Sequence, residues 1–202
     1  MGDGLRGAVH RRYLAMTTGN GRALHPEAVP GQPSAVRWVT EVDLPVGRVV
    51  RAPGTIGPLL DYGVIARMFV ERSGVWMWLT EGHSWIDNGP RIRTALSAAL
   101  DLDGWEVEEG SAELLGLIAR HLLEGEMKAY VASHGGRITV VDATADTLEL
   151  DFGGACVDCP SAGTTLHDRI EAGVARRYPG LAGVSGPVVA EKRGFLGLPR
   201  RR

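Results

Sequence analysis

The chain has 202 residues, with 22 Lys+Arg against 24 Asp+Glu, which gives a formal net charge of −2 at pH 7. This balance argues against a general binder of nucleic acids or anionic membranes, because neutralising phosphates needs a surplus of basic side chains. A hydrophobic fraction of 44% and a charged fraction of 23% are typical of globular proteins, and they argue against disorder throughout. No stretch reaches the roughly 18–20 apolar residues of a membrane span, and residues 1–20 hold no apolar signal-peptide core. We therefore expect a cytoplasmic protein with neither nucleic acid nor a membrane as partner.

Composition divides the chain into two predicted domains, joined by an acidic linker and flanked by two polar ends. The ends carry Gly, Arg and Pro without an apolar period, so we expect both to be disordered. Met16 leaves the true start of the protein open. The expected segments are a leader at 1–30, a small domain at 31–101, a linker at 102–110, a second domain at 111–187 and a basic tail at 188–202.

Alternation and helical spacing predict an α+β first domain. Glu71-Arg-Ser-Gly74 has the chemistry of a hairpin turn between two apolar runs. Both faces of the second run are apolar, so this strand should be buried. The predicted elements are a strand over 36–42, a hairpin of strands over 65–70 and 75–79, and a helix over 90–100 that has Pro90 in its first turn and Asp87 or Asn88 as N-cap. The tryptophans Trp38, Trp76, Trp78 and Trp85 are expected in the core rather than at an interface.

The second domain is predicted to be α+β as well, with the order α-β-β-α(-β). Ser111 is expected to cap a helix that continues to Val131, with Gly125 as its weak point, and Gly135-Gly136 stops this helix. The elements that follow are strands over 137–142 and 147–152, a helix over 161–177 and a short last strand over 181–184.

The two cysteines, Cys156 and Cys159, form a C-x-x-C pair between the second strand and the next helix. Gly153-Gly154 before them and Pro160 after them favour an exposed loop. A thioredoxin-type dithiol needs such a strand-to-helix junction, where the positive helix end favours a thiolate. Here, however, the proline follows the second cysteine, and the surrounding elements are not a βαβ unit.

Three further interpretations of the cysteine pair remain open. Structural zinc needs four ligands, and the candidates His134 and His167 are both expected to face solvent. Two inert thiols would normally be buried among apolar side chains, which an exposed loop does not favour. An iron–sulfur cluster wants four thiolates, which two chains related by a two-fold axis would supply. Gly153 and Gly154 would let the backbone approach such a cluster closely, because they lack a Cβ.

The residues around the cysteines resemble the C-terminal domain of NifU, the Nfu family, over about residues 111 to 187. The resemblance rests on a glycine pair, two strands, Gly-Gly-x-Cys-x-x-Cys and a helix with Thr-Leu, in that order. It is carried by Ser133-His-Gly-Gly-Arg-Ile-Thr-Val, Leu150-Asp-Phe-Gly-Gly-Ala-Cys-Val-Asp-Cys-Pro-Ser, Thr165-Leu166, Ile170-Glu-Ala-Gly and Tyr178-Pro-Gly-Leu-Ala-Gly-Val. The first domain is similar to the Nfu N-terminal domain at Gln32-Pro-Ser-Ala-Val-Arg-Trp, Gly57-Pro-Leu-Leu and Gly74-Val, and this similarity implies docking to a donor or target protein.

The resemblance implies a non-enzymatic carrier that holds a cluster across a homodimer and hands it to apo-proteins after receiving it from a scaffold protein. The cluster would be [4Fe-4S], with [2Fe-2S] as the other possibility, and its iron ligands would be Cys156 and Cys159. The family usually has Gly before the second cysteine, where this chain has Asp158. Asp158 would either add negative charge beside an anionic cluster or cap the following helix. A thiol–disulfide oxidoreductase using the same dithiol is the alternative.

Overall fold

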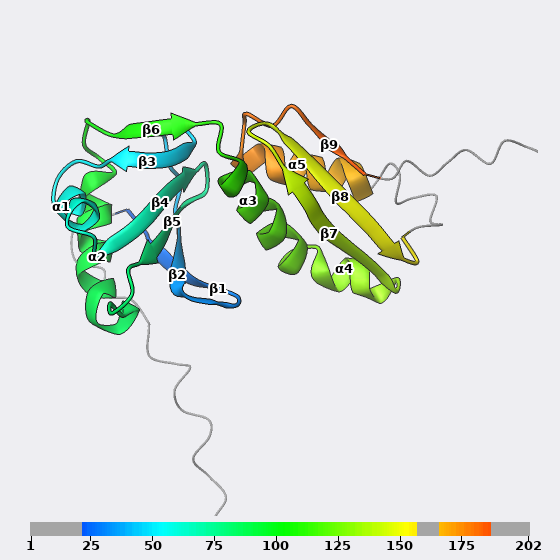
Figure 1. The fold of residues 1–202 in the computed structure, drawn as a ribbon, viewed down its shortest axis with the longest axis horizontal. Helices are drawn as coiled ribbons and strands as arrows, with labels where there is room; N and C mark the ends of the chain where they lie inside the picture. Colours follow the sequence, from blue (N-terminus) through cyan, green and yellow to red (C-terminus); the bar gives the residue numbers. More distant parts are fainter. Residues whose placement is uncertain (1–21, 157–165, 187–202) are drawn as a thin grey trace, which may run out of the picture.

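The computed structural model describes residues 22–156 and 166–186, and these residues form two units, each built on its own sheet (Figure 1). Helices and antiparallel strands are mixed in both, so the fold is α+β as predicted. The first, called the N-terminal unit, covers residues 22–109, and the second, called the C-terminal unit, covers the described residues after 110. No helix in the described part of the chain is long and apolar enough to cross a membrane.

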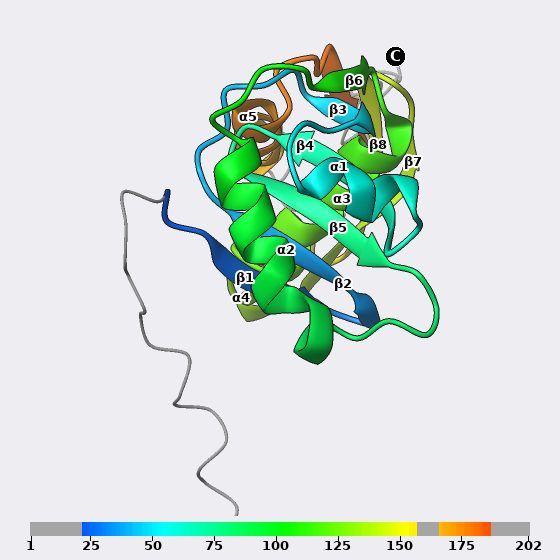
Figure 2. The same ribbon diagram turned by 90° about the vertical axis from the view of Figure 1, so that its left-hand side faces the viewer.

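The N-terminal unit contains a six-stranded sheet with the order β1-β2-β5-β4-β3-β6. All of its neighbouring strands are antiparallel. Figure 2 shows α2 lying across the outer face of this sheet. The elements are β1 His25–Val29, β2 Gln32–Val39, β3 Gly47–Arg51, α1 Ile56–Asp61, β4 Ile65–Glu71, β5 Gly74–Leu79, α2 Trp85–Ala99 and β6 Glu106–Glu109.

The structure confirms the central hairpin of the N-terminal unit. β4 and β5 pair from Ile65 to Glu71 against Gly74 to Leu79, and every residue of β5 is buried. Three of the four tryptophans expected in the core are there, since Trp38, Trp76 and Trp78 are at most 4% exposed, whereas Trp85 is half-buried and packs against the edge of an apolar cluster. Because both faces of β5 are covered by other parts of the protein, neither face of this strand carries polar residues.

Four features of the N-terminal unit differ from the predictions. Residues 22–30 are not part of a leader, because β1 pairs with β2. Residues 106–109, within the segment expected as a linker or as one short strand before a linker, form β6, which pairs with β3. The helix begins at Trp85 rather than at 90, since the Ser84 side chain accepts a hydrogen bond from Asp87 N and caps it. The strand expected over 36–42 is β2, and β3 and α1 were not predicted; the rest of the expected leader, residues 1–21, lies outside the described residues.

The C-terminal unit follows the predicted order of helix, two strands, helix and last strand, except that two helices stand where one was expected at its start. Ser111 caps α3 by accepting from Leu114 N at 3.2 Å, as predicted. Gly125 ends α3, and a separate short helix follows it, so the single long helix expected here is wrong. The elements are α3 Ala112–Glu124, α4 Lys128–Ser133, β7 Gly136–Ala143, β8 Thr147–Gly154, α5 His167–Arg177 and β9 Gly183–Ser185. The sheet order is β7-β8-β9, with β9 parallel to β8.

The helix α3 lies at the boundary between the two units (Figure 1). It buries apolar side chains nearly all round, including Leu114, Leu115 and Ile118 at 0% exposure. The same apolar cluster contains residues of both sheets, among them Phe69, Trp76 and Trp78 from the N-terminal unit and Ile138, Leu148, Leu150 and Phe152 from the C-terminal unit. The two units therefore share this apolar cluster through α3, while a second apolar cluster lies wholly within the N-terminal unit.

Candidate functional site

Cys156 lies just after the end of β8 and is buried, with 6% of its surface exposed. The sequence predicted an exposed loop here because glycines precede the cysteine. That prediction is wrong for Cys156, whose side chain joins the apolar cluster beneath the sheet. Cys159, Asp158 and Pro160 lie outside the described residues, and the part of the predicted helix over 161–165 does so too.

Two glycine pairs face each other where β7 begins and β8 ends. Gly136 pairs with Gly154, and Ala155 N donates a hydrogen bond to Gly135 O at 3.1 Å. Gly154 has φ of +63°, and a Cβ there would collide with Gly135 O. Glycine at this position is therefore required both by conformation and by space. Gly135 has φ of +68° and ends α4 as the left-handed residue that the sequence predicted.

The sulfur of Cys156 occupies the space beside Gly136 that a side chain would take. A Cβ added to Gly136 would overlap Cys156 Sγ and would lie 3.4 Å from Val131 Cγ1. The backbone of Gly136 thus packs directly against the Cys156 thiol. The sequence signal for this contact was the second glycine of the pair, which we interpreted only as a helix stop.

Gly153 is covered by Arg137, its partner across β7 and β8. A Cβ on Gly153 would come within 3.1 Å of the Arg137 guanidinium. Gly153 is buried under this side chain, whereas Gly154 is exposed. Backbone access to a bound group was predicted for both glycines, and in this structure it is Gly154 that faces solvent.

The two histidines considered as zinc ligands are both engaged elsewhere. His134 is exposed, as expected, and its Nδ1 lies 2.9 Å from Tyr130 O in its own helix. His167 is half-buried rather than solvated, because its Nε2 lies 2.8 Å from Val184 O and joins α5 to β9. Among residues 22–156 and 166–186, no three His, Cys, Asp or Glu side chains form a group suited to a metal ion.

A buried charge network joins the two units at the other end of α5. Glu71 is 0% exposed and accepts hydrogen bonds from Arg177 Nε and Nη2, both at 2.9 Å. It also accepts from Arg37 Nε at 2.8 Å, and Arg37 Nη1 donates to Glu27 at 2.7 Å. Two buried cations therefore meet one fully buried carboxylate, that of Glu71, and one half-exposed carboxylate, that of Glu27. Buried charges need such partners.

His121 of α3 lies at the edge of this network. Its Nδ1 is 3.2 Å from Arg177 Nη1, and its Nε2 is 3.5 Å from Glu27. Burial, together with the positive charges of Arg177 and Arg37, holds the pKa of His121 below its ordinary value, against the opposing effect of Glu27 and Glu71. This site therefore favours the neutral imidazole of His121, whose Nδ1 accepts a hydrogen bond from the guanidinium of Arg177.

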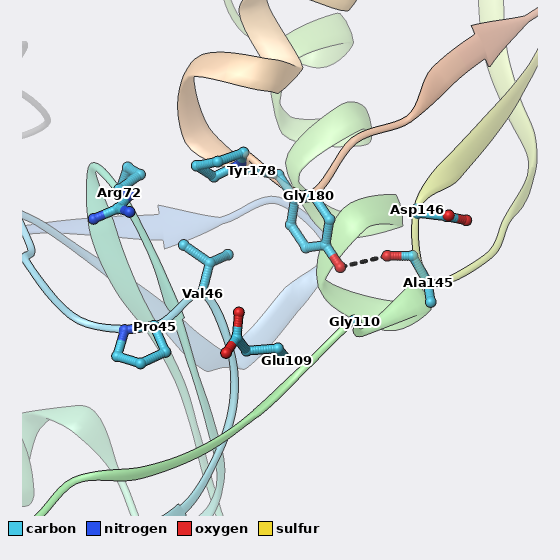
Figure 3. Close-up of a pocket in the computed structure, with 10 residues that line it drawn as sticks. Pro45, Val46, Arg72, Glu109, Gly110, Ala145, Asp146, Tyr178 and Gly180 are labelled. Atoms are coloured by element: carbon cyan, nitrogen blue, oxygen red, sulfur yellow. Dashed lines mark hydrogen bonds between the residues drawn. The ribbon is translucent and has the colours of Figure 1, made fainter.

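A pocket of about 290 Å³ opens at the seam between the units, next to Tyr178 (Figure 3). The Tyr178 hydroxyl donates to Ala145 O at 2.6 Å, and burial raises the pKa of this hydroxyl. Arg72 and Glu109 line the opposite side of the pocket. Because Tyr178 follows the last turn of α5, the pocket lies at the C-terminal end of that helix.

Both cysteines lie in a part of the chain that matches a known protein family. Residues 120–185 match the model of the family described as NifU-like domain. This third of the chain is therefore similar to NifU-like domains. This match confirms the resemblance read from the motifs, and it begins at residue 120, within α3. Both cysteines of the chain lie inside the matched residues.

Curated relatives match the same part of the chain. The Fe/S biogenesis protein NfuA of Yersinia enterocolitica is 37% identical over 65 residues, which are 32% of this chain and 34% of that protein. The Fe/S biogenesis protein NfuA of Xanthomonas euvesicatoria is 38% identical over 79 residues, which are 38% of this chain and 40% of that protein. The matches thus span well under half the length of these relatives. No solved structure gives a significant match.

Sequence reasoning missed two contacts made by residues within the stretch that matches the NifU-like domain. The first is the Glu71–Arg177 ion pair, whose partners are 106 residues apart. The second is the contact of Gly136 with Cys156. Each links residues that are distant in sequence, and a single sequence carries no periodic signal for such a contact.

Proposed function

We propose that this chain carries an iron–sulfur cluster between two copies of itself, bound by Cys156 and Cys159, and transfers it to apo-proteins. The observation that supports this proposal most directly is the match of residues 120–185, both cysteines included, to the NifU-like domain. The curated relatives that share this part of the chain are named Fe/S biogenesis proteins.

The number of thiolates argues for a cluster shared by two chains. Cubane and rhombic clusters take four thiolate ligands, and one chain has two cysteines. A two-fold axis through the cluster brings together the same pair from each copy and completes the set. We favour [4Fe-4S], and [2Fe-2S] satisfies the same ligand count.

Transfer follows from the small number of ligands on each side. The cysteine thiolates of a recipient protein would replace Cys156 and Cys159 stepwise, and each exchange keeps the iron four-coordinate without a change of oxidation state. The cluster is cargo in this scheme, received from a scaffold protein, and the chain is not an enzyme. The N-terminal unit would contribute docking to the donor or to the recipient.

Anaerobic reconstitution tests the proposal. We expect about two irons and two sulfides per chain in a dimer, since four thiolates per dimer hold one four-iron cluster. The variants C156S and C159S should lose the iron and run as monomers while keeping a wild-type circular dichroism spectrum. The control H134Q should retain its iron, because His134 bonds to its own helix. Full iron content in C156S would refute the proposal.

The thiol–disulfide alternative predicts a different result in the same experiment. A colourless monomer with two titratable thiols that reduces a disulfide substrate would favour it. Colour, iron content and mass therefore separate the two functions in one preparation.

A further inference from the structure

The position of Cys156 in this structure conflicts with a ligand position on a cluster between two chains. Its sulfur lies over Gly136 and within an apolar cluster, with 6% of the residue exposed. An iron atom shared with a second copy must lie at the surface where the two chains meet. With 6% of the residue exposed, the sulfur has to be uncovered before an iron atom at that surface can reach it.

Gly136 makes the inward position of the sulfur possible through space rather than through backbone conformation. Its φ is not among the positive values of the chain, so an alanine there would not strain the backbone. The Cβ of that alanine would, however, overlap Cys156 Sγ, and Val131 closes the other side of the same space. Displacing the sulfur is therefore the direct result of adding one carbon at this residue.

The neighbouring Gly135 differs in both respects. It needs its left-handed φ of +68°, and a Cβ added there would meet only Ala155 Cβ, at 3.9 Å. An alanine at Gly135 would strain the backbone and leave the sulfur of Cys156 where it is. The two adjacent glycines thus separate loss of space from loss of conformation.

We propose that Gly136 is a positioning residue that leaves space for the Cys156 sulfur and so keeps this thiol covered. We call this covering of the thiol by the chain the shelter, and the shelter competes with cluster binding. The competition rests on the proposed function, whereas the shelter itself does not. Sheltering would keep the thiol from alkylating or oxidising reagents until iron is offered, and it would lower the affinity for the cluster, which favours release to a recipient.

The shelter can be measured in the full chain prepared free of iron, in a C159S background that leaves Cys156 as the single cysteine. The rate of alkylation by iodoacetamide is compared between native protein and protein in denaturant at the same pH. We expect the native rate to be at least about tenfold lower, because a buried thiol reacts only through local opening. Native and denatured protein that react at equal rates would overturn the proposal, and this comparison needs no glycine variant to fold.

The matched variants G136A and G135A test the role of the single carbon. In the C159S background we expect G136A to raise the native rate at least about fivefold and G135A to change it less than about twofold, since the two act on space and on conformation respectively. Equal acceleration by both would mean general loosening of the turn and would overturn the assignment of Gly136.

Cluster retention tests the competition, in chains that keep both cysteines. A chelator should remove iron more slowly from G136A than from the unsubstituted chain if the shelter opposes binding, and equal or faster loss from G136A would refute competition. An unsubstituted chain that takes up no iron would refute the proposed function and leave the alkylation result standing. A chain that binds iron but gives no alkylation protection in the C159S background would refute the shelter alone.

Discussion

Removing the charge of Glu71 should destabilise the whole chain more than any surface substitution. Glu71 is fully buried, and it holds Arg37 and Arg177, whose side chains are 6% and 9% exposed. The variant E71Q keeps the shape of the side chain but leaves two buried guanidinium groups facing a single carboxylate, that of Glu27. Breaking a buried pair from one side costs about 3–5 kcal/mol, and we expect a loss in this range from the free energy of unfolding.

Urea unfolding followed by tryptophan fluorescence measures this loss, because Trp76 lies beside both guanidinium groups, at 5.8 and 5.9 Å from its ring centre. The control is E106Q, which breaks the exposed pair of Glu106 with Arg51, and it should cost at most about 0.5 kcal/mol. A loss below about 1 kcal/mol in E71Q would show that water or rearrangement compensates the buried cations, and our reasoning would fail.

Two further changes test other parts of the shared core. The pKa of His121 is lowered in the folded chain, so below about pH 6.5 the unfolded chain binds more protons than the folded chain. The free energy of unfolding should therefore fall on acidification. The variant H121Q should reduce this fall, which urea titrations at two pH values would measure. The variant G173A should cost about 1–3 kcal/mol in the same assay, since its Cβ would meet Leu122 Cδ2 at 2.7 Å; a neutral result would show that α3 and α5 can separate freely. Its control G89A has open space within a helix and should be neutral or stabilising by up to about 1 kcal/mol.

Local patterns in the sequence predicted the elements whose signals lie within one short window. The hairpin of β4 and β5, the Ser111 cap and the helix stop at Gly135 are of this kind. The helix α2 was displaced in the prediction because Pro90 suggests a first turn, whereas Ser84 caps the helix and it begins at Trp85, five residues earlier than expected.

Pairings across long distances in the chain could not be predicted in this way. β3 is five residues long and pairs with β6 almost sixty residues later, and neither has the apolar alternation of a half-buried strand. The burial of Cys156 has the same origin. Two glycines before a cysteine indicate an exposed loop locally, but a third glycine, Gly136, provides the space that takes the sulfur inward.

The position of α3 limits how far the part of the chain that matches the NifU-like domain can be separated from the rest. The match to the NifU-like domain starts at residue 120, which lies inside α3, whereas the buried face of that helix begins at Leu114. A fragment cut at the matched residues would lose half of this helix, and one cut at residue 111 would expose the apolar surface that Trp76 and Trp78 cover. We therefore expect exchange of the N-terminal unit between relatives to succeed only when the residues of α3 that pack against that unit are exchanged with it.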